Sequence, residues 1–82
     1  MVPVTQPEAI EMLAVAFGAE PAEVSPETRR EQLPGWDSMG ALLLMAELDE
    51  RFGIQLAAEE SRKMRRIGDI LELLRAHGAL RD

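Results

Sequence analysis

Apolar residues recur at helical spacing in three segments of the chain, and none of the segments shows a convincing strand-like alternation. The first segment follows Thr5, which forms a capping-box pattern with Glu8, and it ends before Gly18. The other two segments end at Gly53 and Gly78. The pattern predicts an all-α fold with helices at about residues 5–17, 37–52 and 68–77 and a short helix at about 59–64.

The segment from 18 to 36 breaks this helical pattern with Pro21, Pro26, Pro34 and Gly35. A connection of this length is unusual in a chain of 82 residues, and we expect Val24 and Leu33 to fasten it to the core. The chain is therefore predicted to be one domain, a bundle of three main helices with a long first loop. The core-facing residues expected on the first and last main helices are Ile10, Leu13, Ala14, Phe17, Ile67, Ile70, Leu71 and Leu74.

The second main helix is apolar on two sides. A core stripe is predicted from Ala41, Leu44, Met45, Leu48 and Phe52. The opposite side carries Met39, Leu42, Leu43, Ala46 and Glu50. One interpretation is a central helix that is buried on both sides, and the other is an exposed apolar strip that docks partner proteins. The pattern leaves both open, although the charges that begin at Glu47 argue against complete burial.

Charge narrows the classes of partner. The formal net charge is −6, and residues 1–60 hold 12 acids against 3 bases, whereas residues 61–82 hold 3 acids against 6 bases. An acidic protein of this kind is poorly suited to bind nucleic acid. Its acidic residues form either a solvated surface or a surface that docks onto basic proteins. Cysteine is absent, and the N-terminal residues show no signal peptide and no membrane span, so we expect a cytoplasmic protein.

Ser38 is the principal candidate for chemistry, because it lies where the long loop meets the second main helix. One interpretation is that Asp37 or Ser38 simply caps the helix. The N-terminal pole of a helix also favours a phosphodiester, so a modified serine is the alternative. Catalysis by Ser38 would need a base, and the single histidine, His77, is near the other end of the sequence. No calcium-loop spacing or phosphate-binding loop occurs, and no metal site is expected.

Four stretches together resemble the acyl and peptidyl carrier protein family. Residues 33–44 resemble its Asp-Ser-Leu attachment motif, with Met39 in place of leucine, and residues 46–54 resemble its second helix. Residues 17–24 and 67–70 resemble the end of its first helix and the start of its last. The resemblance extends over about residues 5–76, and the whole arrangement is far more specific than Asp-Ser alone.

The resemblance implies a non-enzymatic, monomeric carrier. A dedicated phosphopantetheinyl transferase would attach 4'-phosphopantetheine to Ser38, beside the motif acid Asp37, and the arm would hold an acyl or aminoacyl group as a thioester. Further partners would be an acyl- or aminoacyl-activating ligase, a synthase or an acyltransferase. The family's partner-recognition positions correspond to Met39, Leu42, Leu43, Ala46, Asp49 and Glu50.

Three departures point away from the central fatty-acid carriers and towards a specialised lipid or secondary-metabolite pathway. Leu43 replaces a usual Glu, residues 62–66 are basic, and Arg66 replaces the usual Thr or Ser cap. An aminoacyl, D-alanyl or peptidyl carrier is an alternative, because Gly40 after Asp-Ser-Met also occurs in D-alanyl carrier proteins. A more distant alternative is a helical interaction module in which Ser38 stays unmodified.

Overall fold

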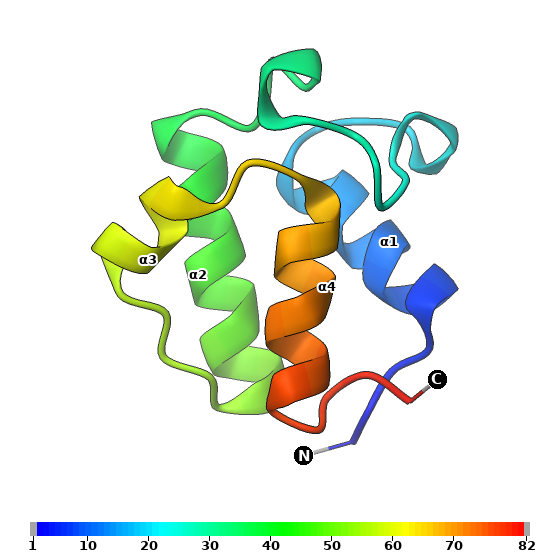
Figure 1. Ribbon diagram of the computed structural model, residues 1–82, viewed down its shortest axis with the longest axis vertical. Coiled ribbons are helices and arrows are strands. Elements are labelled where there is room, and N and C mark those ends of the chain that lie inside the picture. The colour runs from blue at the N-terminus through cyan, green and yellow to red at the C-terminus, as the bar shows by residue number, and fades with distance from the viewer. Residues whose placement is uncertain (1, 82) are drawn as a thin grey trace.

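The computed structural model describes residues 2–81 as a bundle of helices. Three longer helices, α1 (Gln6–Ala16), α2 (Ser38–Phe52) and α4 (Ile67–Ala76), run along the bundle, and the short α3 (Ala58–Lys63) packs beside α2 (Figure 1). The two remaining elements are 3₁₀ turns, η1 (Pro21–Glu23) and η2 (Arg30–Gln32). No strand occurs in the described part of the chain, so the predicted all-α bundle with a long first loop is confirmed.

The helix starts follow from the capping chemistry of the sequence. The Glu8 N–H donates to Thr5 Oγ1 at 3.3 Å and the Thr5 N–H donates to Glu8 Oε1 at 2.8 Å, which confirms the predicted capping box. At the start of α4, the side chain of the N-cap residue Arg66 makes no capping hydrogen bond, and the side chain of Asp69 caps the helix instead. The N–H groups of Arg65 and Arg66 donate to Asp69 Oδ2 at 2.9 and 3.1 Å. These two hydrogen bonds lower the pKa of Asp69, and the bond from Arg65 has the larger effect.

The core lies between the three longer helices. Leu13, Leu44, Leu48, Ile70 and Leu74 are fully or almost fully buried, as the apolar spacing predicts. The structure differs at Ile10, Ala41 and Met45, which are only half-buried. Ala41 and Met45 belong to the side of α2 that turns towards α3, and the six residues of α3 are too few to cover that side.

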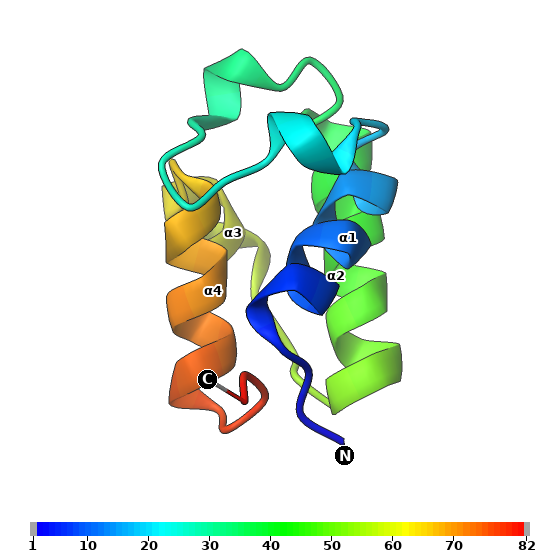
Figure 2. The ribbon, with the colours of Figure 1, turned by 90° about the vertical axis from the view of Figure 1, so that its right-hand side faces the viewer.

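The segment between α1 and α2 closes one end of the bundle (Figure 2). Val24 and Leu33 are both 4% exposed, which confirms that they fasten this segment to the core. Backbone bonds also tie it to the start of α4 and the turn before it. The Arg30 N–H donates to the carbonyl of Arg65 at 2.7 Å, and the Ile67 N–H donates to the carbonyl of Thr28 at 2.9 Å. The segment is therefore an ordered cap on the bundle rather than a loose linker.

The two ends of the described chain lie side by side at the opposite end of the bundle (Figures 1 and 2). The Val4 N–H donates to the carbonyl of Ala79 at 2.9 Å, and the Arg81 N–H donates to the carbonyl of Val4 at 2.8 Å. None of the described helices has the length and apolarity that crossing a membrane requires.

Candidate functional site

Ser38 is the first residue of α2 and is exposed. Asp37 precedes it as the N-cap, and its Oδ1 accepts a hydrogen bond from the Gly40 N–H at 2.9 Å. The helix-cap role that the sequence left to either residue therefore belongs to Asp37. Ser38 keeps an exposed hydroxyl at the positive pole of a helix of 15 residues.

The backbone before Ser38 is held in place by close packing against the end of α1. Trp36 is 3% exposed, and its ring stacks on the ring of Phe17. The backbone is also closely packed at two glycines. A Cβ on Gly35 would overlap the carbonyl oxygen of Phe17, and a Cβ on Gly40 would overlap the carbonyl oxygen of Gly35. Close packing therefore explains why residue 40 is a glycine, whatever cargo the protein carries. The result is a rigid support for an exposed serine.

Beside Ser38, α2 presents an exposed apolar strip of Met39, Leu42 and Leu43. Their side chains are 64%, 59% and 48% exposed. The question that the sequence left open is thereby decided in favour of exposure. Ala46, Asp49 and Glu50 are exposed further along the same helix. Exposed large apolar side chains that adjoin one another are typical of a protein-docking surface.

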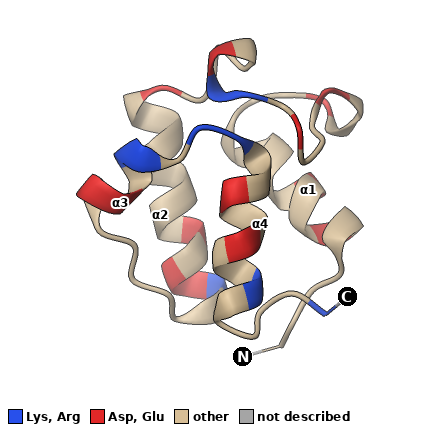
Figure 3. Ribbon diagram, in the orientation of Figure 1, with Lys and Arg blue, Asp and Glu red and all other residues tan. Residues whose placement is uncertain are grey.

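A pocket of about 260 Å³ opens between α2 and α3, and Ser38 is on its rim. Ala41, Leu42 and Met45 form its α2 wall, and Ser61 and Arg62 belong to its α3 wall. Arg30 of η2 completes the lining. Figure 3 shows that Lys and Arg gather over η2, the end of α3 and the connection to α4, at the same end of the bundle as the start of α2. The fold thus places basic side chains from two distant segments near Ser38.

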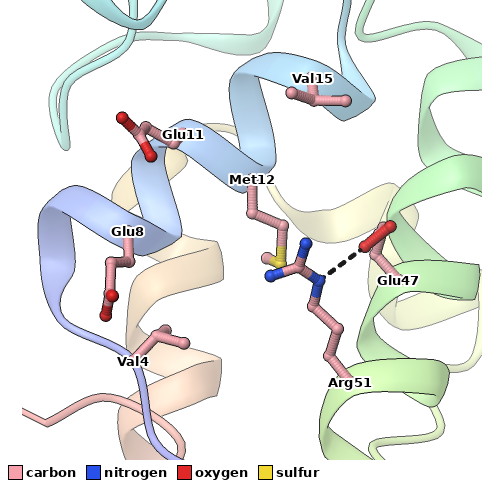
Figure 4. Close-up of a pocket in the computed structure, with 7 residues that line it drawn as sticks. All are labelled: Val4, Glu8, Glu11, Met12, Val15, Glu47 and Arg51. Carbon is pink, nitrogen blue, oxygen red and sulfur yellow. Dashed lines mark hydrogen bonds and ion pairs between the residues drawn. The ribbon is translucent and has the colours of Figure 1, made fainter.

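A second cavity of about 340 Å³ lies between α1 and α2, and Ser38 does not line it. Figure 4 shows Met12 reaching from α1 towards Arg51 of α2, whose Nε donates to Glu47 Oε2 at 3.0 Å. Glu8 and Glu11 of α1 also line this cavity. This cavity is larger than the one beside Ser38, but its arginine is already paired with Glu47, and no hydroxyl side chain is among its lining residues. Proximity to Ser38 makes the α2–α3 pocket the better candidate site.

Two other kinds of chemistry find no support in the described residues. A serine hydrolase would need His77 near Ser38, but α2 begins at one end of the bundle and α4 ends at the other (Figure 1). No three His, Asp or Glu side chains within residues 2–81 are grouped so that they would hold a metal ion.

Sequence reasoning missed three residues around Ser38. Trp36 was placed in the motif but not in the core, and neither Arg30 nor Ser61 was singled out. The positions of Arg30 and Ser61 in the sequence carry no signal, because they lie 8 residues before and 23 residues after Ser38 and converge only in the folded chain. The basic segment 62–66 was recognised as unusual, although not as a neighbour of Ser38.

Comparison with known proteins finds curated relatives of this chain. Two curated relatives, both named acyl carrier protein, come from Rickettsia bellii strains RML369-C and OSU 85-389. Each is 26% identical over 68 residues, which is 83% of this chain and 79% and 84% of theirs. These relatives support an acyl carrier protein assignment. They also support a carrier role in general. No family model matches the chain.

Proposed function

We propose that Ser38 is the attachment point of a 4'-phosphopantetheine arm and that the chain is a carrier domain rather than an enzyme. The observation that carries this is the position of Ser38, exposed at the N-terminal pole of α2 on rigidly packed backbone. The supports are Asp37 as the helix cap, Trp36 in the core, and the resemblance to acyl carrier proteins.

The residues around Ser38 suit such an arm. The Gly40 N–H is already bound by Asp37, but those of Ser38 and Met39 have no acceptor among residues 2–81, as expected in a first helical turn. They and the positive pole of α2 favour a phosphodiester at the Ser38 oxygen. When it is attached, the arm supplies a terminal thiol that holds the cargo as a thioester. Asp37 and Trp36 keep Ser38 fixed, and the tether keeps the cargo at high effective concentration for a docked enzyme.

Partners would dock on the exposed apolar strip next to Ser38. We assign the docking surface to Met39, Leu42 and Leu43, with Ala46, Asp49 and Glu50 extending it along α2. A phosphopantetheinyl transferase is the first expected partner, followed by the ligase, synthase or acyltransferase that loads or unloads the arm. Leu43 and the basic 62–66 segment favour a specialised lipid or secondary-metabolite pathway.

The experiment is co-expression with a broad phosphopantetheinyl transferase, followed by intact mass measurement. The wild-type chain should gain one arm, and the Ser38→Ala variant should gain none. Ser25→Ala and Ser61→Ala are matched controls, because these are the other two serines of the chain, and both should be modified. A wild-type chain that several transferases leave unmodified, or an arm that persists on Ser38→Ala, would refute the proposal.

A further inference from the structure

The hydroxyl of Ser61 has no hydrogen-bond partner among residues 2–81. Ser61 is 3% exposed, it lines the pocket between α2 and α3, and its Oγ is buried without a hydrogen-bond partner. Buried hydroxyls almost always have a partner, because leaving one unsatisfied costs stability. Ser61 and Arg62 are adjacent on α3 and line the same pocket, so a polar group that entered it would meet both.

The cations around this pocket have no carboxylate partner among the described residues. The Arg30 Nε donates to the carbonyl of Trp36 at 3.4 Å, and its guanidinium carbon lies 5.6 Å from the centroid of the Trp36 ring. This contact fixes Arg30 in a half-buried position without neutralising its charge. Within residues 2–81, no carboxylate lies within 4.0 Å of the charged groups of Arg30, Arg62, Lys63 or Arg65.

These unpaired cations are notable in a chain whose net charge is −6. Within residues 2–81, Arg29, Arg51, Arg66 and Arg75 have a carboxylate partner, whereas Arg30, Arg62, Lys63 and Arg65 have none. Of these four unpaired cations, Arg30 and Arg62 line the pocket. Two arginines and a serine with an unsatisfied hydroxyl thus line a cavity whose other wall is apolar, with Ala41, Leu42 and Met45. Guanidinium groups together with a hydroxyl are a typical donor set for an oxyanion.

We propose that this pocket binds an anionic group carried on the arm at Ser38, with Arg30 and Arg62 supplying charge and Ser61 Oγ donating a hydrogen bond. This rests on the proposed function. The anion is either the phosphodiester next to Ser38 or a carboxylate at the end of the cargo. In both cases the apolar wall of Ala41, Leu42 and Met45 is next to the bound anion and can cover methylene groups of the arm or cargo.

The test compares the apo chain with three forms loaded by a transferase from coenzyme A, succinyl-coenzyme A and 4-methylpentanoyl-coenzyme A. The last two cargoes have the same branched shape and differ in the terminal carboxylate. Intact mass shows whether each form is loaded. The readouts are the thermal midpoint and the side-chain Nε–H resonances of Arg30 and Arg62. The variants are Ser61→Ala and Arg62→Gln, with Lys63→Gln as the matched control, because Lys63 is the adjacent cation and does not line the pocket.

If the phosphodiester is the anion, all three loaded forms shift the two Nε–H resonances and raise the midpoint of the wild type. If the cargo carboxylate is the anion, only the succinyl form does so. In either case Arg62→Gln loses most of the increase and Lys63→Gln keeps it, and raising the salt concentration weakens it. Ser61→Ala affects the apo and loaded forms differently. Its apo form is at least as stable as the wild type, because an unsatisfied buried hydroxyl is removed. Its thermal midpoint does not rise on loading.

Two results would overturn the anion site while leaving the carrier function intact. One is loading, verified by mass, that leaves both Nε–H resonances unmoved. The other is a midpoint that rises more with 4-methylpentanoyl than with succinyl and is indifferent to Arg62→Gln, which would make the pocket purely apolar. A chain whose mass never changes instead refutes the attachment of the arm, and that failure is seen before any measurement on the pocket.

Discussion

The ring of Trp36 is stacked on the ring of Phe17, with the two centroids 4.8 Å apart and the planes inclined by 12°. Phe17 is the C-cap of α1 and Trp36 is two residues before Ser38, so this contact joins the end of one helix to the start of another. The position of Ser38 is therefore set by the core, although Ser38 itself is exposed.

Replacing Trp36 should separate the stabilising effect of its stacked ring from the cost of its buried Nε1–H, which has no hydrogen-bond partner among the described residues. We expect Trp36→Ala to lower the free energy of unfolding by about 3–5 kcal/mol, the usual cost of removing a large buried aromatic side chain. Trp36→Phe should cost clearly less, because a ring can still stack on Phe17 and the buried Nε1–H, which has no partner, disappears. Urea unfolding followed by far-UV circular dichroism measures both. Equal losses in the two variants would contradict this role for the stacked ring.

Gly40→Ala tests the close approach of α2 to the preceding loop. In an open helix, this change would stabilise by about 1 kcal/mol through helix propensity. Here the new Cβ would overlap the carbonyl oxygen of Gly35 and lie 3.1 Å from Cδ1 of Phe17. We therefore expect a net loss of about 1–3 kcal/mol, as for other overpacked sites. The control is Ala46→Gly on the exposed side of α2, which should cost only the propensity, and a stabilised Gly40→Ala chain would disprove the contact.

Asp37 has a structural role that can be measured apart from modification. Asp37→Ala removes the acceptor of the Gly40 N–H and should lower stability by about 1 kcal/mol. Asp37→Asn keeps the acceptor and should stay within a few tenths of a kcal/mol of the wild type. Comparing the two variants by urea unfolding, and then by the rate of arm attachment, shows whether the transferase needs the charge or only the capped helix. Asparagine that destabilises as much as alanine would argue against the cap.

The lowered pKa of Asp69 makes part of the stability depend on pH. The folded-state pKa lies below the unfolded value, because the N–H groups of Arg65 and Arg66 donate to the carboxylate. The contribution is therefore fully present above the unfolded pKa, about 4, and is lost as the pH falls through the folded-state pKa. The thermal midpoints of wild type and Asp69→Asn should differ at neutral pH and converge in acid. A difference that is the same at both pH values would rule this linkage out.

The apolar strip should matter for docking and not for folding. Leu43→Glu places a charge on a half-exposed position, so the free energy of unfolding should change by no more than about 0.5 kcal/mol. The rate of arm attachment should fall about tenfold if the side chain contributes about 1.4 kcal/mol to docking. Val15→Glu is the matched control, because Val15 is 82% exposed on α1, away from the strip. Equal rates for both variants would place the docking surface elsewhere.

Local chemistry in the sequence predicts the helices well. Thr5 and Glu8 specify where α1 begins, and Leu44 and Leu48 specify which side of α2 is buried, because caps and periodicity act over one or two turns. The same reasoning left the exposure of Leu43 open, since the spacing of apolar residues does not reveal how many neighbours surround a helix. It also placed Met45 in the core, whereas in the structure Met45 lines the pocket facing α3.

The site around Ser38 was predictable in part only. The Asp-Ser motif and the long loop identified the serine, but the contacts that surround it join segments far apart in the chain. The stacking of Trp36 on Phe17 links residues 19 positions apart, and Arg30, Ser61 and Arg62 meet only because η2 packs on the connection before α4. Such convergence depends on tertiary packing, which a single sequence does not specify.

The hydrogen bonds that join Val4 to Ala79 and Arg81 have a practical consequence for protein engineering. Val4 and Arg81 lie at the pole away from Ser38, so a fusion partner or a surface anchor attached beyond either residue leaves the serine and the α2–α3 pocket facing solvent. Because Val4 and Arg81 are hydrogen-bonded neighbours, a short linker is enough to join the two segments, and the described fold is then a candidate for circular permutation with new ends in an exposed loop.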